Sequence, residues 1–282
     1  MMRRWAATIS IFLVIAALSG GALAVEAPAD GTNAPSAGVT LTEEERMLVA
    51  ASQTTPVRIG VIPSYAPLCY FDEASGVYEG IIIEMLDTAA SHTGLRIEYV
   101  WIDMLQGSPP EQVKAGTQEL VAGILKAPGN LSDRELVISD DLANDTLVMV
   151  GRHGEDFASD PQSKTIALMR SFPMAKQYIA AQFPYHNVTE YDTQEQCLEA
   201  VARGKADATP YMRTCMNYML QNPHYQGLEI AAAYSMDVAI GLAGSAKEKA
   251  ALVALIDKGL AGITENRRNQ IMMDFTIMHP YE

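Results

Sequence analysis

The stretch GILKAPGNLSDREL, residues 123–136, combines residue types that hold a small anion. A turn is followed by an amide, Asn130, and by one arginine, Arg134. A planar guanidinium matches a carboxylate with two hydrogen bonds, so an arginine placed in a cleft can hold an anionic ligand. Arg134 also stands between Asp133 and Glu135, which fits a solvated surface charge. The elements around this loop must decide between the two interpretations.

Motifs for catalysis and metal binding are absent from the sequence. There is no Gly-x-Ser-x-Gly, no His-Glu-x-x-His and no glycine-rich phosphate loop. The five histidines, at positions 92, 153, 186, 224 and 279, lack the spacing of metal ligands. We therefore predict that the protein is not an enzyme, and we expect no catalytic residue, no metal and no cofactor.

The N-terminus has the three parts of a secretory signal peptide. Arg3 and Arg4 form a positive region, Ile9 to Leu18 an apolar core, and Ala22-Leu23-Ala24 a small-residue cleavage site. The apolar core is short for a membrane span. We predict a signal peptide over residues 1–24 and a periplasmic or other extracytoplasmic location, with an uncleaved membrane anchor as the alternative.

Charge and cysteine content limit the partners and the redox chemistry. The formal net charge is −14, and removal of residues 1–24 takes away two arginines and no acidic residue, which leaves −16. Such an acidic protein is a poor partner for nucleic acid or an anionic membrane. Cys197 and Cys215 can form one disulfide, which leaves Cys69 over; three free thiols are the alternative.

The sequence of residues 25–56 predicts a disordered leader followed by a short helix. Residues 25–40 are rich in Pro, Ala, Gly and Ser, which is typical of a disordered segment. The sequence LTEEERMLVAAS then favours a helix, because Thr42 can cap it and Glu45, three residues later, completes a capping box.

From residue 57 onward the pattern alternates between strands and helices. We expect strands at 57–62, 95–102, 119–125, 146–151, 165–169, 206–210, 228–234 and 237–244, and helices at 81–94, 111–116, 173–181, 193–204, 211–221, 245–262 and 264–275. In the first of these helices, Ile82, Met85, Leu86 and Ala89 share one face, and Gly94 ends it. Alternation of this kind predicts an α/β architecture with mostly parallel sheets.

Three segments carry a resemblance to a known family. They are RIGVIPSYAPLCYFDEASGVYEGIIIEML, LVAGILKAPGN and LEAVARGKADA. In order and spacing the chain resembles the bacterial extracytoplasmic solute-binding proteins of family 3, the amino-acid-binding type, and the sensor domains built from them. The resemblance runs from about Val57 to Phe275.

The resemblance implies a two-lobe Venus-flytrap fold that closes on a small ligand in the cleft between the lobes. Lobe 1 would comprise residues 57–146 and 241–282, and lobe 2 residues 150–236. Two hinge strands, near 146–151 and 236–243, would join the lobes.

The residues that anchor an amino acid in the family do not carry over. An alignment without gaps places Ala127 and Asn130 at the threonine and arginine of the family's Thr-x-x-Arg. It places Met212 at the ammonium-binding aspartate, and Phe172, with Ser171 beside it, at the hydroxyl of a lobe 2 helix. A buried zwitterion would leave its charges unpaired there, which is costly. We therefore expect a ligand other than an ordinary free α-amino acid.

The aromatic wall of the family's site does carry over. Tyr65 matches the tyrosine that covers the ligand, and Tyr70 follows on the same loop. A shift of a few residues in the alignment would bring Arg134 or Arg170 to the ligand, so we keep Arg170 as a candidate. Without a shift we expect Arg134 to lie outside the cleft.

The resulting prediction is a non-catalytic binding protein whose partner is a small molecule. It would serve uptake with an ABC transporter permease, or ligand sensing with a membrane receptor. The alternative is the periplasmic input domain of a histidine kinase or diguanylate cyclase, which the LTEEER helix favours and the end of the chain at HPYE disfavours. A remote alternative is a cyclohexadienyl-dehydratase-like enzyme, against which the missing arginine at Asn130 counts.

Overall fold

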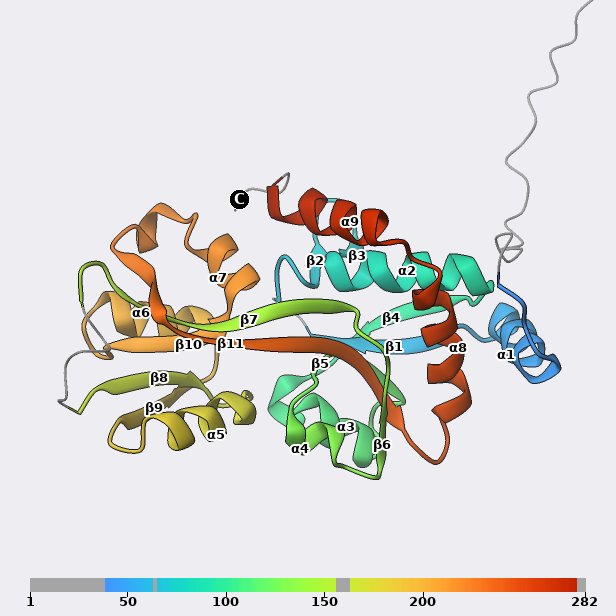
Figure 1. The fold of residues 1–282 in the computed structure, drawn as a ribbon, viewed down its shortest axis with the longest axis horizontal. Helices are drawn as coiled ribbons and strands as arrows, with labels where there is room; N and C mark the ends of the chain where they lie inside the picture. Colours follow the sequence, from blue (N-terminus) through green and yellow to red (C-terminus); the bar gives the residue numbers. More distant parts are fainter. Residues whose placement is uncertain (1–38, 63–64, 156–162, 278–282) are drawn as a thin grey trace, which may run out of the picture. The chain divides into compact units, whose positions relative to one another are not determined.

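The computed structural model describes residues 39–62, 65–155 and 163–277 (Figure 1). The predicted signal peptide, and the predicted leader up to residue 38, lie outside these ranges. Within them we find no helix with the length and hydropathy that a membrane crossing requires.

Helices and strands alternate along the first half of the described chain. Its elements are α1 (Glu43–Thr54), β1 (Val57–Val61), β2 (Tyr70–Asp72), β3 (Val77–Glu79), α2 (Ile81–Thr93), β4 (Ile97–Trp101), the 3-10 turn η1 (Met104–Gln106), α3 (Pro109–Lys114), β5 (Leu120–Leu125), α4 (Pro128–Leu131), β6 (Leu136–Ile138) and β7 (Ala143–Arg152).

The second half continues the alternation and ends in two helices. Its elements are β8 (Thr165–Met169), α5 (Pro173–Gln182), β9 (Asn187–Tyr191), α6 (Gln194–Ala202), β10 (Ala208–Met212), α7 (Arg213–Met219), the 3-10 turn η2 (Pro223–Tyr225), β11 (Leu228–Ser245), α8 (Ala250–Ala261) and α9 (Glu265–Ile277).

The main sheet is mixed, so the expectation of mostly parallel pairing is wrong. The strand order is β4-β1-β5-β11-β7-β10-β8-β9, with β6 also paired to β11. The pairs β1–β4, β1–β5, β10–β8 and β8–β9 are parallel, whereas β11 runs antiparallel to β5, β6 and β7, and β10 antiparallel to β7. The antiparallel pairs arise because β7 and β11 run side by side through the middle of the sheet.

Strand β11 is one long strand where the sequence predicts two. It pairs with β7 from Leu228 to Ile240 and with β5 from Ile240 to Gly244, and the register shifts between Ala231 and Ser235. That irregularity lies in the last part of the first predicted strand, 228–234, before the second, 237–244, begins. The chain therefore passes the interruption without leaving the sheet.

Helix α2 forms as predicted, and the C-terminal helices α8 and α9 contact it. Ile82, Met85, Leu86 and Ala89 are all buried, and Gly94 ends the helix in a left-handed conformation with φ 82°. The backbone of α8 approaches that of α2 closely, because a Cβ added at Gly259 would lie 2.9 Å from the carbonyl carbon of Ala89. From α9, Arg267 forms an ion pair with Glu84 of α2. In Figure 1, α2 and α9 lie on one side of the strands, and α3 and α4 on the other. The lobe boundaries stay predictions.

Helix α1 has the predicted capping box and is fastened to α8. The Thr42 hydroxyl accepts a hydrogen bond from the Glu45 backbone N–H at 3.3 Å, and the Thr42 N–H donates to Glu45 Oε2 at 2.6 Å. Lys258 of α8 donates to the same carboxylate at 2.6 and 2.8 Å and to the Thr40 carbonyl at 2.9 Å. This triple contact ties the start of α1 to the C-terminal part of the chain.

The three cysteines are buried free thiols. Of the two alternatives, the one with no disulfide therefore holds. Cys197 lies in α6, Cys215 in α7, and Cys69 on the loop before β2.

Candidate functional site

A cavity of about 150 Å³ is lined by residues from both halves of the chain. Segments around β1, α3, β5 and α4 form one wall, and the ends of β8 and β10 with the start of α5 form the other. The lining residues are Ile62, Tyr65, Met104, Ser108, Pro109, Pro110, Gly123, Ile124, Leu125, Ala127, Gly129, Asn130, Met169, Ser171, Phe172, Gln177 and Tyr211. None of these described side chains is charged.

Three aromatic rings, of Tyr65, Phe172 and Tyr211, line the cavity and contact one another. The Tyr211 ring meets Tyr65 edge-on, with the ring centroids 6.0 Å apart, and meets Phe172 edge-on at 5.8 Å. All three are at most 8 % exposed. Burial raises the pKa of the Tyr65 and Tyr211 hydroxyls well above their usual value, so both phenols stay protonated and can donate a hydrogen bond.

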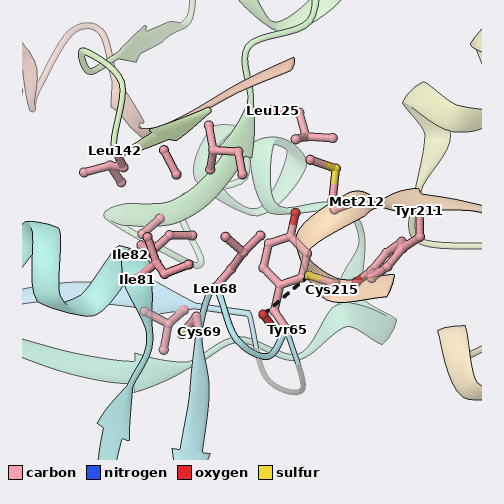
Figure 2. Packing of buried hydrophobic residues seen from close by; sticks show 14 of the residues in the cluster. Tyr65, Leu68, Cys69, Ile81, Ile82, Leu125, Leu142, Tyr211, Met212 and Cys215 are labelled. Carbon is pink, nitrogen blue, oxygen red and sulfur yellow. Dashed lines mark hydrogen bonds between the residues drawn. The ribbon is translucent and has the colours of Figure 1, made fainter. Parts of the chain in front are cut away.

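Tyr65 is held in place by a tight loop. Its backbone N–H donates to the Cys69 carbonyl at 2.9 Å, and the Cys69 N–H donates back to the Tyr65 carbonyl at 3.0 Å. The Cys215 thiol of α7 donates to that same carbonyl at 3.8 Å. Figure 2 shows the Tyr65 ring packed among Leu68, Met212 and Cys215. Side chains from the second half of the chain therefore support a residue that the first half supplies.

Asn130 lies at the cavity, and Arg134 does not. The Asn130 side chain sits in α4 and donates from Nδ2 to the Leu125 carbonyl at 2.8 Å, which fixes the orientation of its amide. Arg134 is exposed and is not part of the lining. The expectation that Arg134 lies outside the cleft, with Asn130 closer, agrees with this placement.

Four of the predicted site residues line the cavity together. They are Tyr65, Asn130, Ser171 and Phe172. Their contact with a ligand stays a prediction.

Three predicted site residues do not line the cavity. Tyr70 lies in the β2–β3 hairpin, where its hydroxyl donates to Glu79 Oε2 at 3.1 Å. Arg170 is exposed and forms an ion pair with Asp192. Met212 is completely buried in β10 and packs into the core instead. In each case a partner or the core holds the side chain away from the cavity.

Tyr211 lines the cavity and was missed from the sequence. It precedes Met212 in β10, and successive side chains of a strand point to opposite faces. The ungapped alignment selects Met212. An alignment shifted by one residue would select Tyr211, whose side chain points to the opposite face of the strand. Gly123 was also missed: it has φ +90°, and an added Cβ would lie 3.1 Å from Ile62 Cδ1, so this position needs glycine beside the cavity.

The described residues contain no group of three His, Cys, Asp or Glu side chains arranged to hold a metal ion. The chemistry that the cavity itself offers is apolar contact and neutral hydrogen bonding.

Solved structures match most of the chain, whereas sequence comparison finds nothing. No protein-family model and no curated protein sequence matches. The periplasmic VFT2 domain of BvgS from Bordetella pertussis superposes with a TM-score of 0.71 at 20% identity, over 84% of this chain and 99% of that one. The chain has the periplasmic binding protein fold.

A solute receptor and a transporter substrate-binding protein match the same Venus-flytrap fold. A solute receptor for L-cysteine from Neisseria gonorrhoeae has a TM-score of 0.67 at 20% identity, over 82% of this chain and 94% of that one. The amino acid ABC transporter substrate-binding protein AbpA of Streptococcus pneumoniae, bound to L-arginine, has 0.67 at 15% identity, over 80% and 97%. The predicted resemblance to amino-acid-binding proteins and sensor domains is confirmed at the level of structure, and identities this low show the fold alone.

Proposed function

We propose that the protein is an extracytoplasmic binding protein that holds a small solute in the cavity around Tyr65, Phe172 and Tyr211. The observation that carries the proposal is that both halves of the chain line this one cavity. A ligand in such a position stabilises the arrangement in which the walls are together, and so shifts the population between open and closed forms. The closed form then serves ABC-type uptake or ligand sensing.

A thermal-shift screen of the purified protein tests binding. We expect a ligand among small solutes to raise the melting temperature by mass action. Phe172→Ala should lose most of that shift because it removes one of the three rings. Tyr185→Ala is the matched control, because its ring is 84 % exposed and is not part of the cavity. A shift that survives Phe172→Ala places the binding elsewhere.

The sensor version of this function has one specific observation in its favour. Helix α1, which precedes β1, is fastened to α8 through Lys258, so the segment before the fold is held against the folded part of the chain. Affinity purification from membranes distinguishes the two roles. Retention of a transporter permease only when ligand is present supports uptake, and retention of a histidine kinase or diguanylate cyclase supports sensing.

Export and the absence of catalysis are parts of the same proposal. Cell fractionation followed by N-terminal sequencing should find the protein outside the cytoplasm, starting at Val25 if the signal peptide is cleaved.

The lining residues provide no carboxyl, imidazole or guanidinium group for a dehydratase. Incubation with prephenate should therefore leave the substrate unchanged, and measurable turnover would favour the enzyme alternative.

A further inference from the structure

The charge pattern around the cavity points to a class of ligand, and this inference rests on the proposed function. We infer that the cavity takes a small uncharged ring compound that bears a hydrogen-bonding group, such as an alcohol, a phenol or an amide. It is an inference about the same site, and four features of the structure support it.

Cations that directly adjoin lining residues in sequence are engaged elsewhere. One of them, Lys176 beside Gln177, forms an ion pair with Glu190. Lys126 stands between two lining residues, yet its ammonium donates to Asp141 Oδ1 at 2.7 Å and to the Ser139 carbonyl at 3.1 Å. Arg170 also stands between two lining residues, and its guanidinium pairs with Asp192. A carboxylate ligand in the cavity would therefore meet no described cation that is free to turn inward from these three positions.

Two carboxylates of the surrounding segments are occupied too. Glu111 caps its own helix, because its Oε2 accepts hydrogen bonds from the Ser108 N–H at 2.8 Å and the Ser108 hydroxyl at 2.7 Å. Asp145 accepts from the Thr146 N–H at 2.6 Å and from the Thr214 N–H at 3.3 Å, and it does not line the cavity. An ammonium group on a ligand would have no carboxylate among the lining residues with which to pair.

The size and walls of the cavity fit one small ring. A cavity of about 150 Å³ is large enough for a benzene-sized molecule. The rings of Tyr65, Phe172 and Tyr211 meet edge-on rather than stacked. Aromatic pairs favour such edge-to-face and offset contacts, so a further ring can join this cluster with the same geometry.

Two hydroxyl groups are available for the ligand's polar atom. Neither the Tyr65 nor the Tyr211 hydroxyl makes a hydrogen bond to a described residue. Among described side chains, the one fully buried polar atom without a partner is Gln194 Oε1, so neither phenol oxygen is fully buried, and both tyrosines line the cavity. A buried polar group is normally hydrogen-bonded. A hydroxyl or carbonyl on the ligand would satisfy these donors.

Calorimetry with matched ligands tests the class. Benzyl alcohol, phenol and benzamide are the neutral probes; benzoate, benzylamine and phenylalanine have the same ring and carry charge. We expect at least one neutral probe to bind at least 100-fold more tightly than its charged counterparts, which corresponds to about 2.8 kcal/mol. Equal or tighter binding of a charged probe in the cavity overturns the inference, and so does the failure of every neutral probe to bind.

Single-hydroxyl variants locate the polar contact. Tyr211→Phe and Tyr65→Phe keep the rings, and we expect one of them to weaken the best neutral probe about tenfold without changing the urea midpoint. Tyr99→Phe is the matched control: its hydroxyl donates to Asp87 Oδ1 at 2.6 Å, so its loss should affect stability and leave affinity unchanged. Unchanged affinity in both test variants removes the tyrosines from the ligand's polar contact and overturns this part of the inference.

The two proposals fail in different ways. Binding of a charged amino acid that Phe172→Ala abolishes would leave the proposed function standing and show the ligand class to be wrong. No stabilisation by any solute in the broad screen would instead contradict the proposed function itself.

Discussion

Substituting one glycine tests whether the C-terminal helices pack on α2. In α8, a Cβ built on Gly259 would lie 2.9 Å from the carbonyl carbon and 3.0 Å from the Cα of Ala89 in α2. Because these are backbone atoms, no side chain can rotate to make room. Gly259→Ala must therefore push the two helices apart.

Whether Gly259→Ala raises or lowers the free energy of unfolding depends on how closely α8 packs against Ala89. In an exposed helix, replacing glycine with alanine stabilises by up to about 1 kcal/mol. Overpacking a tight contact costs about 1–3 kcal/mol, and a clash with backbone belongs at the upper end. We expect Gly259→Ala to lower the free energy of unfolding by about 2 kcal/mol, which for a chain of this size lowers the melting temperature by about 4–8 °C.

Urea denaturation followed by circular dichroism measures the change. Gly129→Ala in α4 is the matched control, because an added Cβ at Gly129 meets nothing within 4 Å, so stability should stay unchanged or rise by up to about 1 kcal/mol. If Gly259→Ala left stability unchanged or raised it, α8 would not pack closely on α2, and the assignment of residues 241–282 to lobe 1 would lose its support.

Three further predictions concern charged residues. Lys258→Met should make the backbone amides of α1 exchange their hydrogens faster, as measured by mass spectrometry. Lys258 lowers the pKa of the Glu45 carboxyl, so the stability from this contact is present above the ordinary pKa of 4.5 and is lost as the pH falls through the lowered value. Burial raises the pKa of the Asp145 carboxyl. Its contribution to the stability of the fold is therefore greatest below the ordinary pKa of 3.8 and is lost as the pH rises through the raised value. Urea midpoints measured between pH 3 and 6 should fall less with rising pH in Asp145→Asn than in the wild type. Arg134→Ala should leave ligand affinity within about tenfold, or about 1.4 kcal/mol, by calorimetry, and a larger loss would mean that this arginine reaches the ligand.

Elements with strong local signals were predictable from the sequence. The capping box of Thr42 and Glu45 and the ending of α2 at Gly94 depend only on residues within the same turn, and both are present. The buried face of α2 follows from the 3.6-residue period of its apolar side chains. For such segments, local preference and tertiary packing favour the same structure.

Edge strands and long-range pairing were not predictable in the same way. Strand β9 (Asn187–Tyr191) is mostly exposed and polar, so it lacks the apolar pattern of a buried strand. Strand β6 (Leu136–Ile138) has three residues, too few for a period to be visible. The continuity of β11 depends on β7 and β5, which pair with it from far away in the sequence.

The candidate site shows why residue type is easier to predict than residue position. All five residues of β10 are buried, so the strand has no alternation of polar and apolar side chains that would fix which face each one occupies. The sequence predicts a strand that ends at residue 210, whereas β10 continues through Tyr211 to Met212, and the ungapped alignment selects Met212 in place of Tyr211. The charges raise a similar difficulty, because Lys126 and Arg170 are held by carboxylates 15 and 22 residues away. A cation beside a lining residue is available to a ligand only if no closer carboxylate holds it, and that depends on the tertiary fold. The neutrality of the cavity is thus a property of these long-range pairs as much as of the residues that line it.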